Sequence, residues 1–435
     1  MVDFSIITII RGLLGLTSLL LISFLFSNNR KKIQWKTVFI SIFIQFIIAV
    51  LILKISLIQS IFEIISKFFV RIINYTTSGS SFLFSSLVDQ QKFAYIFAFQ
   101  VLPVIIFFSA LTSVLYHLGA IQKIVSFLAL ILNKFLKITG AESLSLAGNI
   151  FLGQTESPIL IKSYLEKMTK SQLFVVMVGG MSTVAGSVLA AYIGLLGGND
   201  INEQLKFSNH LLTASVMAAP GAVAISKIIF PEETKSVKEE IKIDTKNKNG
   251  NILLSVTGGT IEGVKLAVNV GAMLLVFLAF IALLNDIMWL IGESLNFNTL
   301  ISESTSFDQF SIEFVLGYLF APLMWLIGVT YQECAVMGQL LGVKIVSSEF
   351  VAFIQLSDLK NIDSSIELLS KKSITMATFM LCGFANLTSI GIQIGGIGVL
   401  APEQRKNLSE LGFKAMIAGT IVSLISACFA GVLIS

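Results

Sequence analysis

Residues 149–194 decide how the rest of the chain is interpreted, and they read NIFLGQTESPILIKSYLEKMTKSQLFVVMVGGMSTVAGSVLAAYIG. This stretch places an amide, Asn149, and a polar turn at 153–156 (GQTE) inside sequence that is otherwise apolar. The apolar run that follows is interrupted by Gly179, Gly180, Thr183, Gly186 and Ser187. An ionisable side chain at membrane depth costs about 2.5–3.5 kcal/mol to insert, so it usually faces a cavity where it has a function. Because broken helices survive there only where they line protein or water, the stretch predicts half of a solute-binding site.

The composition identifies a polytopic membrane protein. Of the 435 residues, 55% are hydrophobic and only 13% are charged, whereas a soluble chain has about 25% charged residues. The three cysteines lie in apolar sequence, which indicates small core residues rather than a disulfide set. The formal net charge of +4 is small and lies in loops, so nucleic acid is not expected as a partner.

Eight apolar segments are long enough to cross a bilayer, which takes about 17–25 residues. They are residues 4–26, 37–54, 93–116, 172–197, 208–230, 264–292, 373–398 and 411–433. Two further apolar segments, 57–73 and 121–138, carry spaced charges, which indicates helices lying in the interface. Segment 311–328 is similar but more apolar, and it is either an in-plane helix or a ninth span. We therefore expect an all-α polytopic membrane protein with eight transmembrane helices and several interfacial helices.

Basic residues predict the orientation, because they concentrate in cytoplasmic loops. The first loop carries Arg30, Lys31, Lys32 and Lys36. This loop is therefore expected inside and the N-terminus outside, and segment 231–263 becomes a charged cytoplasmic linker. Eight spans return the C-terminus to the outside, so both termini are extracytoplasmic in a bacterial-type inner (plasma) membrane. Three lysines then fall on the outer face, against the rule: Lys360, Lys371 and Lys372.

The two halves of the chain have the same order of segments. Residues 93–230 contain a span, an in-plane helix, a polar hairpin at 143–168, a broken span and a final span. Residues 264–435 repeat this order with a hairpin at 332–358, and residues 1–92 precede both repeats as scaffold spans with an interfacial helix. In the predicted orientation the two hairpins enter from opposite faces, so the repeat is inverted. Paired, interrupted segments in matching positions point to a transporter site near the bilayer midplane.

The polar side chains of these segments indicate the kind of ligand. They are Gln154, Thr155 and Glu156 in the first hairpin, Glu349 in the second, and Asn386, Thr388 and Ser389 beside Phe384 in the second broken span. Amides, hydroxyls and two carboxylates suit a polar, neutral ligand that is rich in O–H and N–H donors. An anion would call for an arginine, and the hairpins and broken spans contain none.

Structural explanations compete with these assignments. Gln154 and Asn386 could be hydrogen-bonding residues between helices, and Glu349 could pair with Lys344. The glycines could serve close packing alone, and Thr183 could bond back to its own helix. The pattern occurs in both halves of the chain, which favours the binding interpretation.

Four motifs resemble the concentrative nucleoside transporter family. They are GQTESP at 153–158, GGMSTVAGSVLAAY at 179–192, GVKIVSSEFVAF at 342–353 and CGFANLTSIGIQIGG at 382–396. The resemblance extends from about residue 90 to the C-terminus. It implies eight spans, two re-entrant hairpins, a homotrimer and an elevator-like movement.

The resemblance also implies roles for individual residues. Those implied to meet the nucleobase are Gln154, Thr155, Glu156 and, beside it, Val188. Those implied to hold the ribose are Glu349, Asn386 and Ser389, near Phe384. Na+ is implied at the side chains of Asn149 and Thr183 and the carbonyls of Leu152 and Val184. Three positions depart from the family pattern: Ser348 replaces Asn, Ser157 replaces Ala and Thr183 replaces Ser.

The leading hypothesis is a secondary transporter that imports nucleosides by cation symport, with Na+ as coupling ion and no other cofactor. Proton coupling is the nearest alternative. An intramembrane enzyme with Glu156 and Glu349 as its acid and base is less favoured, because these segments hold no nucleophile–histidine pair and no metal cluster. A channel is disfavoured, since two occluding hairpins suit alternating access better than a continuous pore.

Overall fold

The computed structural model describes residues 6–89, 96–198, 200–233, 251–361 and 369–434. All regular structure within these ranges is helical, which confirms the all-α prediction. Most of the predicted linker and the first residues of the predicted spans 4–26 and 93–116 lie outside the described residues.

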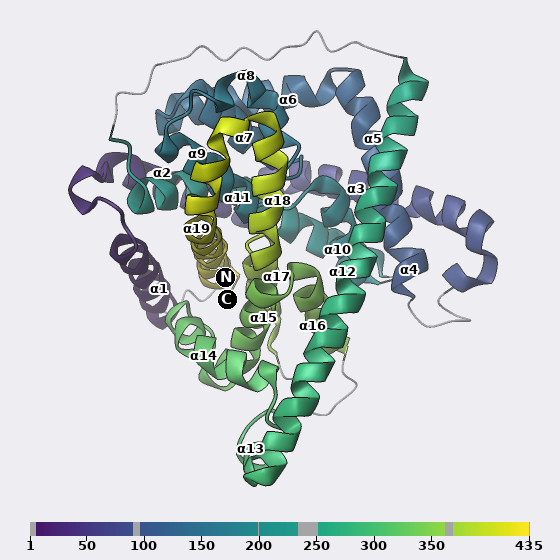
Figure 1. Cartoon of the computed structure of the whole chain (residues 1–435), viewed down its shortest axis with the longest axis vertical. Helices are drawn as coiled ribbons and strands as arrows, with labels where there is room; N and C mark the ends of the chain where they lie inside the picture. The colour runs from purple at the N-terminus through teal and green to yellow at the C-terminus, as the bar shows by residue number, and fades with distance from the viewer. Residues whose placement is uncertain (1–5, 90–95, 199, 234–250, 362–368, 435) are drawn as a thin grey trace.

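The helices fall into three groups along the chain (Figure 1). The N-terminal group is α1 (Ile6–Leu25), η1 (Arg30–Lys32), α2 (Trp35–Lys54), α3 (Ser56–Phe84) and η2 (Ser85–Val88). The second group is α4 (Phe97–Gln100), α5 (Leu102–His117), α6 (Ala120–Leu136), α7 (Gly140–Asn149), η3 (Ser157–Ile161), α8 (Lys162–Leu165), α9 (Lys170–Ser182), α10 (Gly186–Gly197) and α11 (Ile201–Ile229). The third group is α12 (Ile252–Ser294), α13 (Phe297–Ser304), α14 (Ile312–Leu326), η4 (Tyr331–Glu333), α15 (Cys334–Val346), α16 (Glu349–Asn361), α17 (Lys371–Leu381), α18 (Leu387–Leu400), η5 (Pro402–Gln404) and α19 (Arg405–Leu433).

The described part of the chain contains seven helical segments that are long and apolar enough to cross a membrane. Each of them corresponds to one of the predicted spans. The eighth, 373–398, consists of two shorter helices, α17 and α18, with residues 382–386 between them. Helix α14 has 15 residues, about 22 Å at 1.5 Å per residue, which is shorter than the ~30 Å bilayer core. This length argues against a ninth span at 311–328.

Helix α12 occupies the last part of the segment predicted as a linker, 231–263. It begins at Ile252, inside that segment, and continues for 43 residues, about 65 Å at the helical rise. The Asn251 side chain caps its first turn by accepting from the Leu254 amide at 2.9 Å. Gly259 and Gly263 then bring α12 against the backbone of α5, where an added Cβ would lie 2.8 Å from a backbone atom at each position. Gly259 and Gly263 therefore serve close packing of α12 against α5.

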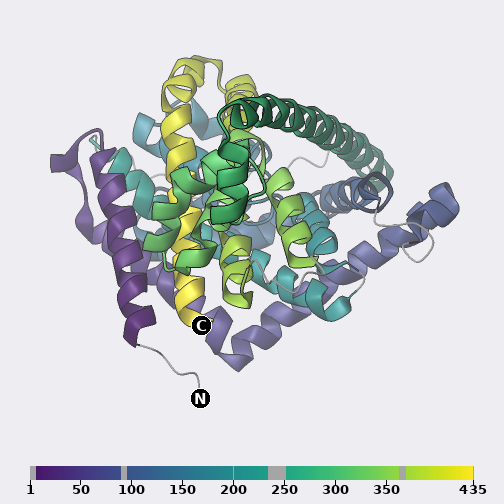
Figure 2. The same cartoon turned by 90° about the horizontal axis from the view of Figure 1, so that it is seen from below.

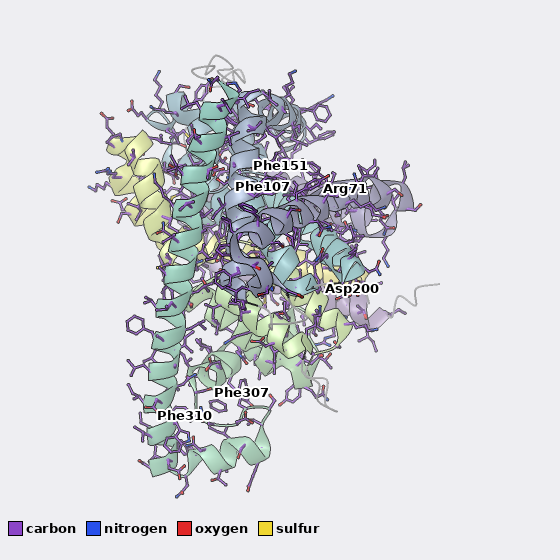
Figure 3. The ribbon with its side chains drawn as sticks, turned by 90° about the vertical axis from the view of Figure 1, so that its right-hand side faces the viewer. Arg71, Phe107, Phe151, Asp200, Phe307 and Phe310 are labelled. Atoms are coloured by element: carbon purple, nitrogen blue, oxygen red, sulfur yellow. The ribbon has the colours of Figure 1, made fainter. Side chains whose placement is uncertain are left out.

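The helix at the predicted interfacial segment 57–73 is longer than predicted, because α3 runs for 29 residues to Phe84. Figures 1 and 2 both show α3 lying across the molecule, and Figure 1 shows α12 running from its top to its bottom. Figure 3 shows α12 along one edge over the full height, with Phe307 and Phe310 near its lower end. Helices α9, α10, α11 and α19 form the buried centre, and α1, α5 and α12 are mostly exposed around it.

The final helices of the two repeats, α11 and α19, run in opposite directions. At one end, the Ile229 carbonyl accepts from the Asn28 amide at 2.8 Å, and the Lys414 ammonium donates to the Asn28 side chain at 2.5 Å. Further along both helices, Gly221 lies against Val422. Antiparallel packing of corresponding helices is the geometry of an inverted repeat.

The first halves of the two broken helices are also oppositely directed relative to α19. Helix α9 begins with Lys170, whose ammonium lies 2.7 Å from the Glu410 carboxylate near the start of α19. Helix α17 instead packs near the end of α19, where Met376 meets Gly431. Each of these helices therefore enters from a different end of the molecule, as the inverted repeat predicts.

The two breaks meet in the centre of the protein. The Phe384 amide donates to the Thr183 carbonyl at 3.3 Å, which joins one repeat to the other. Gly383 has φ of +147°, and a Cβ there would lie 3.0 Å from the Met181 carbonyl oxygen. Only glycine fits such a backbone approach without strain, so this residue allows the two interruptions to touch.

Candidate functional site

A pocket of about 310 Å³ lies where the two hairpins and the two breaks come together. All eight residues predicted to bind the substrate line it: Gln154, Thr155, Glu156, Val188, Glu349, Phe384, Asn386 and Ser389. Ser348, one of the three positions that depart from the family pattern, lines it as well. We call this the transport pocket, and its volume is near the lower end of the ~300–1,000 Å³ range of ligand sites.

The first hairpin is shaped by its caps and by one proline. Helix α7 begins with a capping box in which the Thr139 side chain accepts from the Glu142 amide and the Glu142 carboxylate accepts from the Thr139 amide. A buried 2.7 Å ion pair between Glu142 and Lys227 fixes this end to α11. Pro158 starts the 3₁₀ helix η3, a position that needs no amide donor. The turn between these elements carries the polar residues of the site.

The tip of this hairpin packs closely on the other elements of the site. At Gly180 on α9, an added Cβ would lie 2.9 Å from the Gln154 Cβ, so the missing side chain makes room for the tip. The Gln154 amide then donates to the Ser389 hydroxyl on α18 at 3.1 Å. Two predicted site residues from different repeats therefore contact each other directly.

The second half of the site is organised by the start of α18. Asn386 is the N-cap of this helix, and its side-chain oxygen accepts from the Ser389 amide at 2.8 Å. Its amide group donates to one oxygen of Glu349 at 2.6 Å, and the Tyr192 hydroxyl donates to the other oxygen at 3.0 Å. Glu349 is buried, so these two donors hold a carboxylate whose remaining lone pairs can accept from a ligand.

Of two structural alternatives, a Glu349–Lys344 ion pair and a bond from Thr183 to its own helix, only the second is formed. The Lys344 ammonium is fully buried and donates to the Met380 carbonyl at 2.8 Å, at the end of α17. No ion pair with Glu349 occurs within the residues that the structure describes, so the predicted Glu349–Lys344 pair is not formed. Thr183 does bond back to its own helix, because its hydroxyl donates to the Gly179 carbonyl at 2.9 Å. That bond leaves the lone pairs of the hydroxyl oxygen available.

Several residues of the site, both lining residues and the Glu349 partner Tyr192, were not predicted from the sequence. Tyr192 gave no signal, because a tyrosine in an apolar run is as common in cores as in sites. The outer wall of the pocket comes from α12, through Leu266, Asn269, Val270, Met273, Leu274 and Phe277. Asn269 is a polar side chain within a predicted span, and that property could have identified it.

Two of the residues implied for Na+, Asn149 and Thr183, share Gly179 as a neighbour beside the first break. Asn149 is 1% exposed, and neither its side-chain oxygen nor its nitrogen has a hydrogen-bond partner. It lies close to Gly179, whose carbonyl accepts from Thr183. Within the described part of the chain, no hydrogen bond reaches the carbonyl of Leu152 or Val184. Orphaned buried oxygens need a partner, and small hard cations prefer oxygen ligands, so this set fits Na+.

Comparison with known families agrees with this geometry. The family model for the N-terminus of Na+ dependent nucleoside transporters matches residues 14–87, and the nucleoside recognition (gate) model matches residues 98–199. The model for the C-terminus of Na+ dependent nucleoside transporters matches residues 210–431. The chain belongs to the Na+-dependent nucleoside transporter family. It is a transporter rather than an enzyme, as predicted.

Relatives of this nucleoside transporter chain are similar over nearly its whole length. An uncharacterized transporter of Haemophilus influenzae is 39% identical, with 98% of each chain covered. Sodium/nucleoside cotransporter 2 of Rattus norvegicus is 37% identical over 96% of this chain and 62% of its own length. The structure of CNTnw in an inward-facing, substrate-bound state superposes with a TM-score of 0.89 at 36% identity, covering 98% of both chains. These similarities confirm the resemblance stated from the motifs.

Proposed function

We propose that this protein imports nucleosides across a bacterial-type inner membrane by Na+ symport, through an elevator-type movement of a homotrimer. In this proposal the hairpins are re-entrant, the chain crosses the membrane eight times, and both termini are extracytoplasmic. The observation that carries the substrate assignment is the chemistry of the transport pocket. Its described lining contains no lysine, arginine or histidine, and it combines two carboxylates with amides, hydroxyls and an aromatic side chain. These groups suit a neutral ligand with many donors, as a nucleoside is.

Different parts of the pocket suit different parts of a nucleoside. Gln154 and Glu156 provide acceptors and a donor for the edge of a base, and Val188 provides an apolar contact. Glu349, held by Asn386 and Tyr192, provides a charged acceptor for ribose hydroxyls. A hydrogen bond to a charged group contributes about 1.5–3 kcal/mol, against about 1 kcal/mol for a neutral one. We therefore assign ribose recognition to Glu349.

Na+ coupling is supported by the unpartnered side chain of Asn149 beside Thr183. One cation that moves inward across 100 mV releases about 2.3 kcal/mol. At 1.4 kcal/mol per tenfold, this allows roughly 40-fold accumulation of a neutral substrate. Residues 149 and 183 lie next to the tip and the break that shape the transport pocket, so ion binding and substrate binding share the same elements.

The elevator movement is supported by the two kinds of wall around the transport pocket. The ligand-binding wall comes from hairpins and broken helices that pack on α11 and α19. The opposite wall is α12, and its lining is apolar except for Asn269. An apolar wall loses few hydrogen bonds when a neighbouring body slides along it. The binding unit can therefore move past α12 as a body.

The test is uridine uptake into proteoliposomes at fixed pH and an inside-negative potential, with Na+ replaced by choline in the control. We expect accumulation that requires Na+ and is lost in choline. Uptake that ignores Na+ and follows an imposed proton gradient would transfer the coupling to H+. Counterflow of labelled uridine separates a carrier from a channel, because only a carrier exchanges labelled for unlabelled substrate. No uridine movement under any gradient would overturn the assignment.

A further inference from the structure

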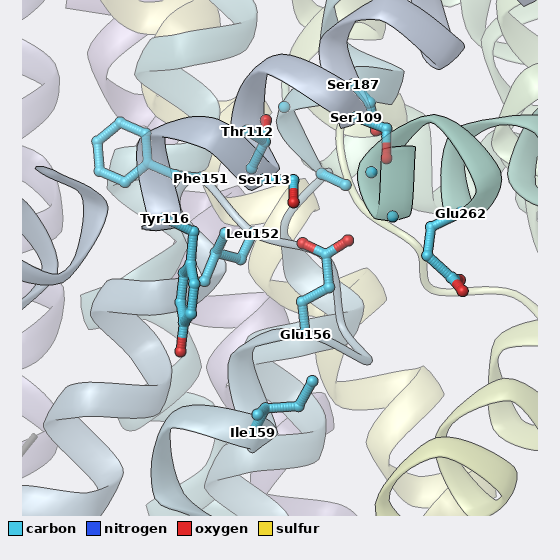
Figure 4. Close-up of a pocket in the computed structure, with 14 residues that line it drawn as sticks. Ser109, Thr112, Ser113, Tyr116, Phe151, Leu152, Glu156, Ile159, Ser187 and Glu262 are labelled. Carbon is cyan, nitrogen blue, oxygen red and sulfur yellow. The ribbon is translucent and has the colours of Figure 1, made fainter. Parts of the chain in front are cut away.

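A second pocket of about 280 Å³ lies beside the transport pocket and shares Glu156 and Ala185 with it (Figure 4). We propose that this second pocket is a release site, which binds the nucleoside again after it leaves the transport pocket. This inference rests on the proposed function. The release site is lined by α5, the first hairpin, the start of α10 and the start of α12.

The release site has a stripe of hydroxyl groups on one face of α5. The stripe consists of Ser109, Thr112, Ser113 and Tyr116. Their spacing of three, four and seven residues places them on the same side of a helix. Ser187 adds a hydroxyl from α10, and Figure 4 shows the Glu156 carboxylate turned toward Ser113. In an otherwise apolar helix such a row is suited to a ligand with many hydrogen-bonding groups.

The same classes of side chain line both pockets. The transport pocket combines carboxylates and hydroxyls with the ring of Phe384, and the release site combines them with the rings of Phe151 and Tyr116. Glu262 lies at the edge of the release site, where its side chain is 70% exposed and 3.0 Å from the Lys265 ammonium. The positive charge of Lys265 offsets the negative charge of Glu262, so this edge of the site favours a neutral solute. A nucleoside that fits the first pocket therefore meets matching chemistry in the second.

Glycine keeps the release site open. At Gly258 on α12, an added Cβ would have no atom within 4 Å. The neighbouring Gly259 lies against α5, so the helices approach closely without filling the space between them. A larger side chain at position 258 would enter the pocket rather than clash with the backbone.

The position along α12 indicates the direction of release. Residues 258–262 line the release site and residues 266–277 line the transport pocket, so the centres of the two linings lie about 17 Å apart along α12 at the helical rise. The release site is nearer to the start of α12, which follows the linker predicted to be cytoplasmic. The geometry therefore places it between the transport pocket and the inner face.

The decisive test uses a single introduced thiol. Ser113→Cys places a small thiol in the release site, and the three native cysteines are all buried, so the wild-type protein gives the background. A membrane-impermeant thiol reagent is applied to either side of proteoliposomes at increasing uridine concentrations. We expect modification from the linker side only, and we expect uridine to slow it. Thr112→Cys on the same helix face repeats the measurement if Ser113→Cys does not insert.

A second substitution distinguishes uridine binding at the release site from uridine binding at the transport pocket. Asn386→Ala weakens the transport pocket, and we expect it to raise the uptake KM while the uridine concentration that half-protects Ser113→Cys stays unchanged. A half-protection concentration that shifts in step with the KM would show that the thiol reports only on the transport pocket, and it would overturn the release site. Absence of protection, or modification only from the opposite side, would also overturn it. If wild-type protein takes up no uridine, the proposed function itself fails.

Filling the release site gives an independent measurement. We expect Gly258→Leu to lower kcat for uptake by about tenfold, because product release limits the turnover of many enzymes, while equilibrium binding of uridine to the transport pocket stays unchanged. Gly79→Leu in α3 is the matched control, since an added Cβ there also meets no atom within 4 Å. Equal turnover in both variants would contradict a release path through this pocket.

Discussion

The hydroxyl of Tyr192 provides the sharpest test of the ribose assignment, because its role is visible only in the structure. It donates to Glu349 at 3.0 Å, and the ring is fully buried. The ring also packs against Phe350 and Phe353, with centroids 4.7 and 4.2 Å away. Tyr192→Phe therefore removes one hydrogen bond to the carboxylate and keeps the aromatic packing that holds the site together.

The expected loss of uridine affinity in Tyr192→Phe follows from the type of hydrogen bond that is removed. A hydrogen bond to a charged group contributes about 1.5–3 kcal/mol, which is roughly 10- to 150-fold in affinity at 1.4 kcal/mol per tenfold. Tyr192 and Glu349 are both buried, so solvent does not weaken this hydrogen bond by screening. The loss should appear for uridine, because Glu349 then accepts from the ribose hydroxyls in a less fixed orientation. A dideoxy analogue lacks those hydroxyls and should lose much less.

The assay is uptake of uridine and the dideoxy analogue by the same vesicles. Tyr75→Phe is the control, since Tyr75 is 65% exposed and remote from the pocket. A tenfold or greater rise in the uridine KM, with a smaller rise for the analogue, is the expected result. Equal losses for both substrates would refute the reasoning, because the bond would then support the fold rather than orient the ribose acceptor.

Three further predictions concern the coupling ion, the two carboxylates and the anchor of the first hairpin. Thr183→Val keeps the shape and removes an oxygen, so the Na+ concentration for half-maximal uptake should rise by about tenfold; an unchanged value would remove Thr183 from the ion site. Glu349→Gln should reduce uptake of uridine more than of the dideoxy analogue, whereas Glu156→Gln should reduce both alike, and the reverse pattern would contradict the division of roles. Lys227→Met leaves its buried carboxylate partner unpaired and should cost about 3–5 kcal/mol, read as a lower Tm in detergent. Lys170→Met breaks a half-exposed pair that solvent screens, so it should lower the Tm much less; equal Tm values in the two variants would show that the buried pair does not anchor the hairpin.

Lys360 is paired in the structure, although the predicted orientation leaves it on the outer face. Lys360 conflicted with the rule, and the structure shows its ammonium 3.1 Å from Glu203 and 2.6 Å from the Leu196 carbonyl.

The sequence by itself determined the membrane class, most of the spans, the repeated order of elements and the residues of the transport pocket. These features are local, because the length of an apolar run and its interruption by glycine, amide or carboxylate are visible in one short window. The site residues were also carried by motifs that resemble a known family. Together these signals were sufficient to name eight of the residues that line the pocket, but none of those that α12 contributes.

Only the tertiary structure decided which residues meet. Gln154 and Ser389 are 235 positions apart, Tyr192 reaches Glu349 from another repeat, and Lys344 binds a helix end rather than Glu349, its alternative partner. Helix α12 begins at Ile252, before the predicted span at 264–292, and its packing against α5 through Gly259 and Gly263 was not predicted. Contacts of this kind depend on how whole helices pack against each other, and no short window of sequence contains that information.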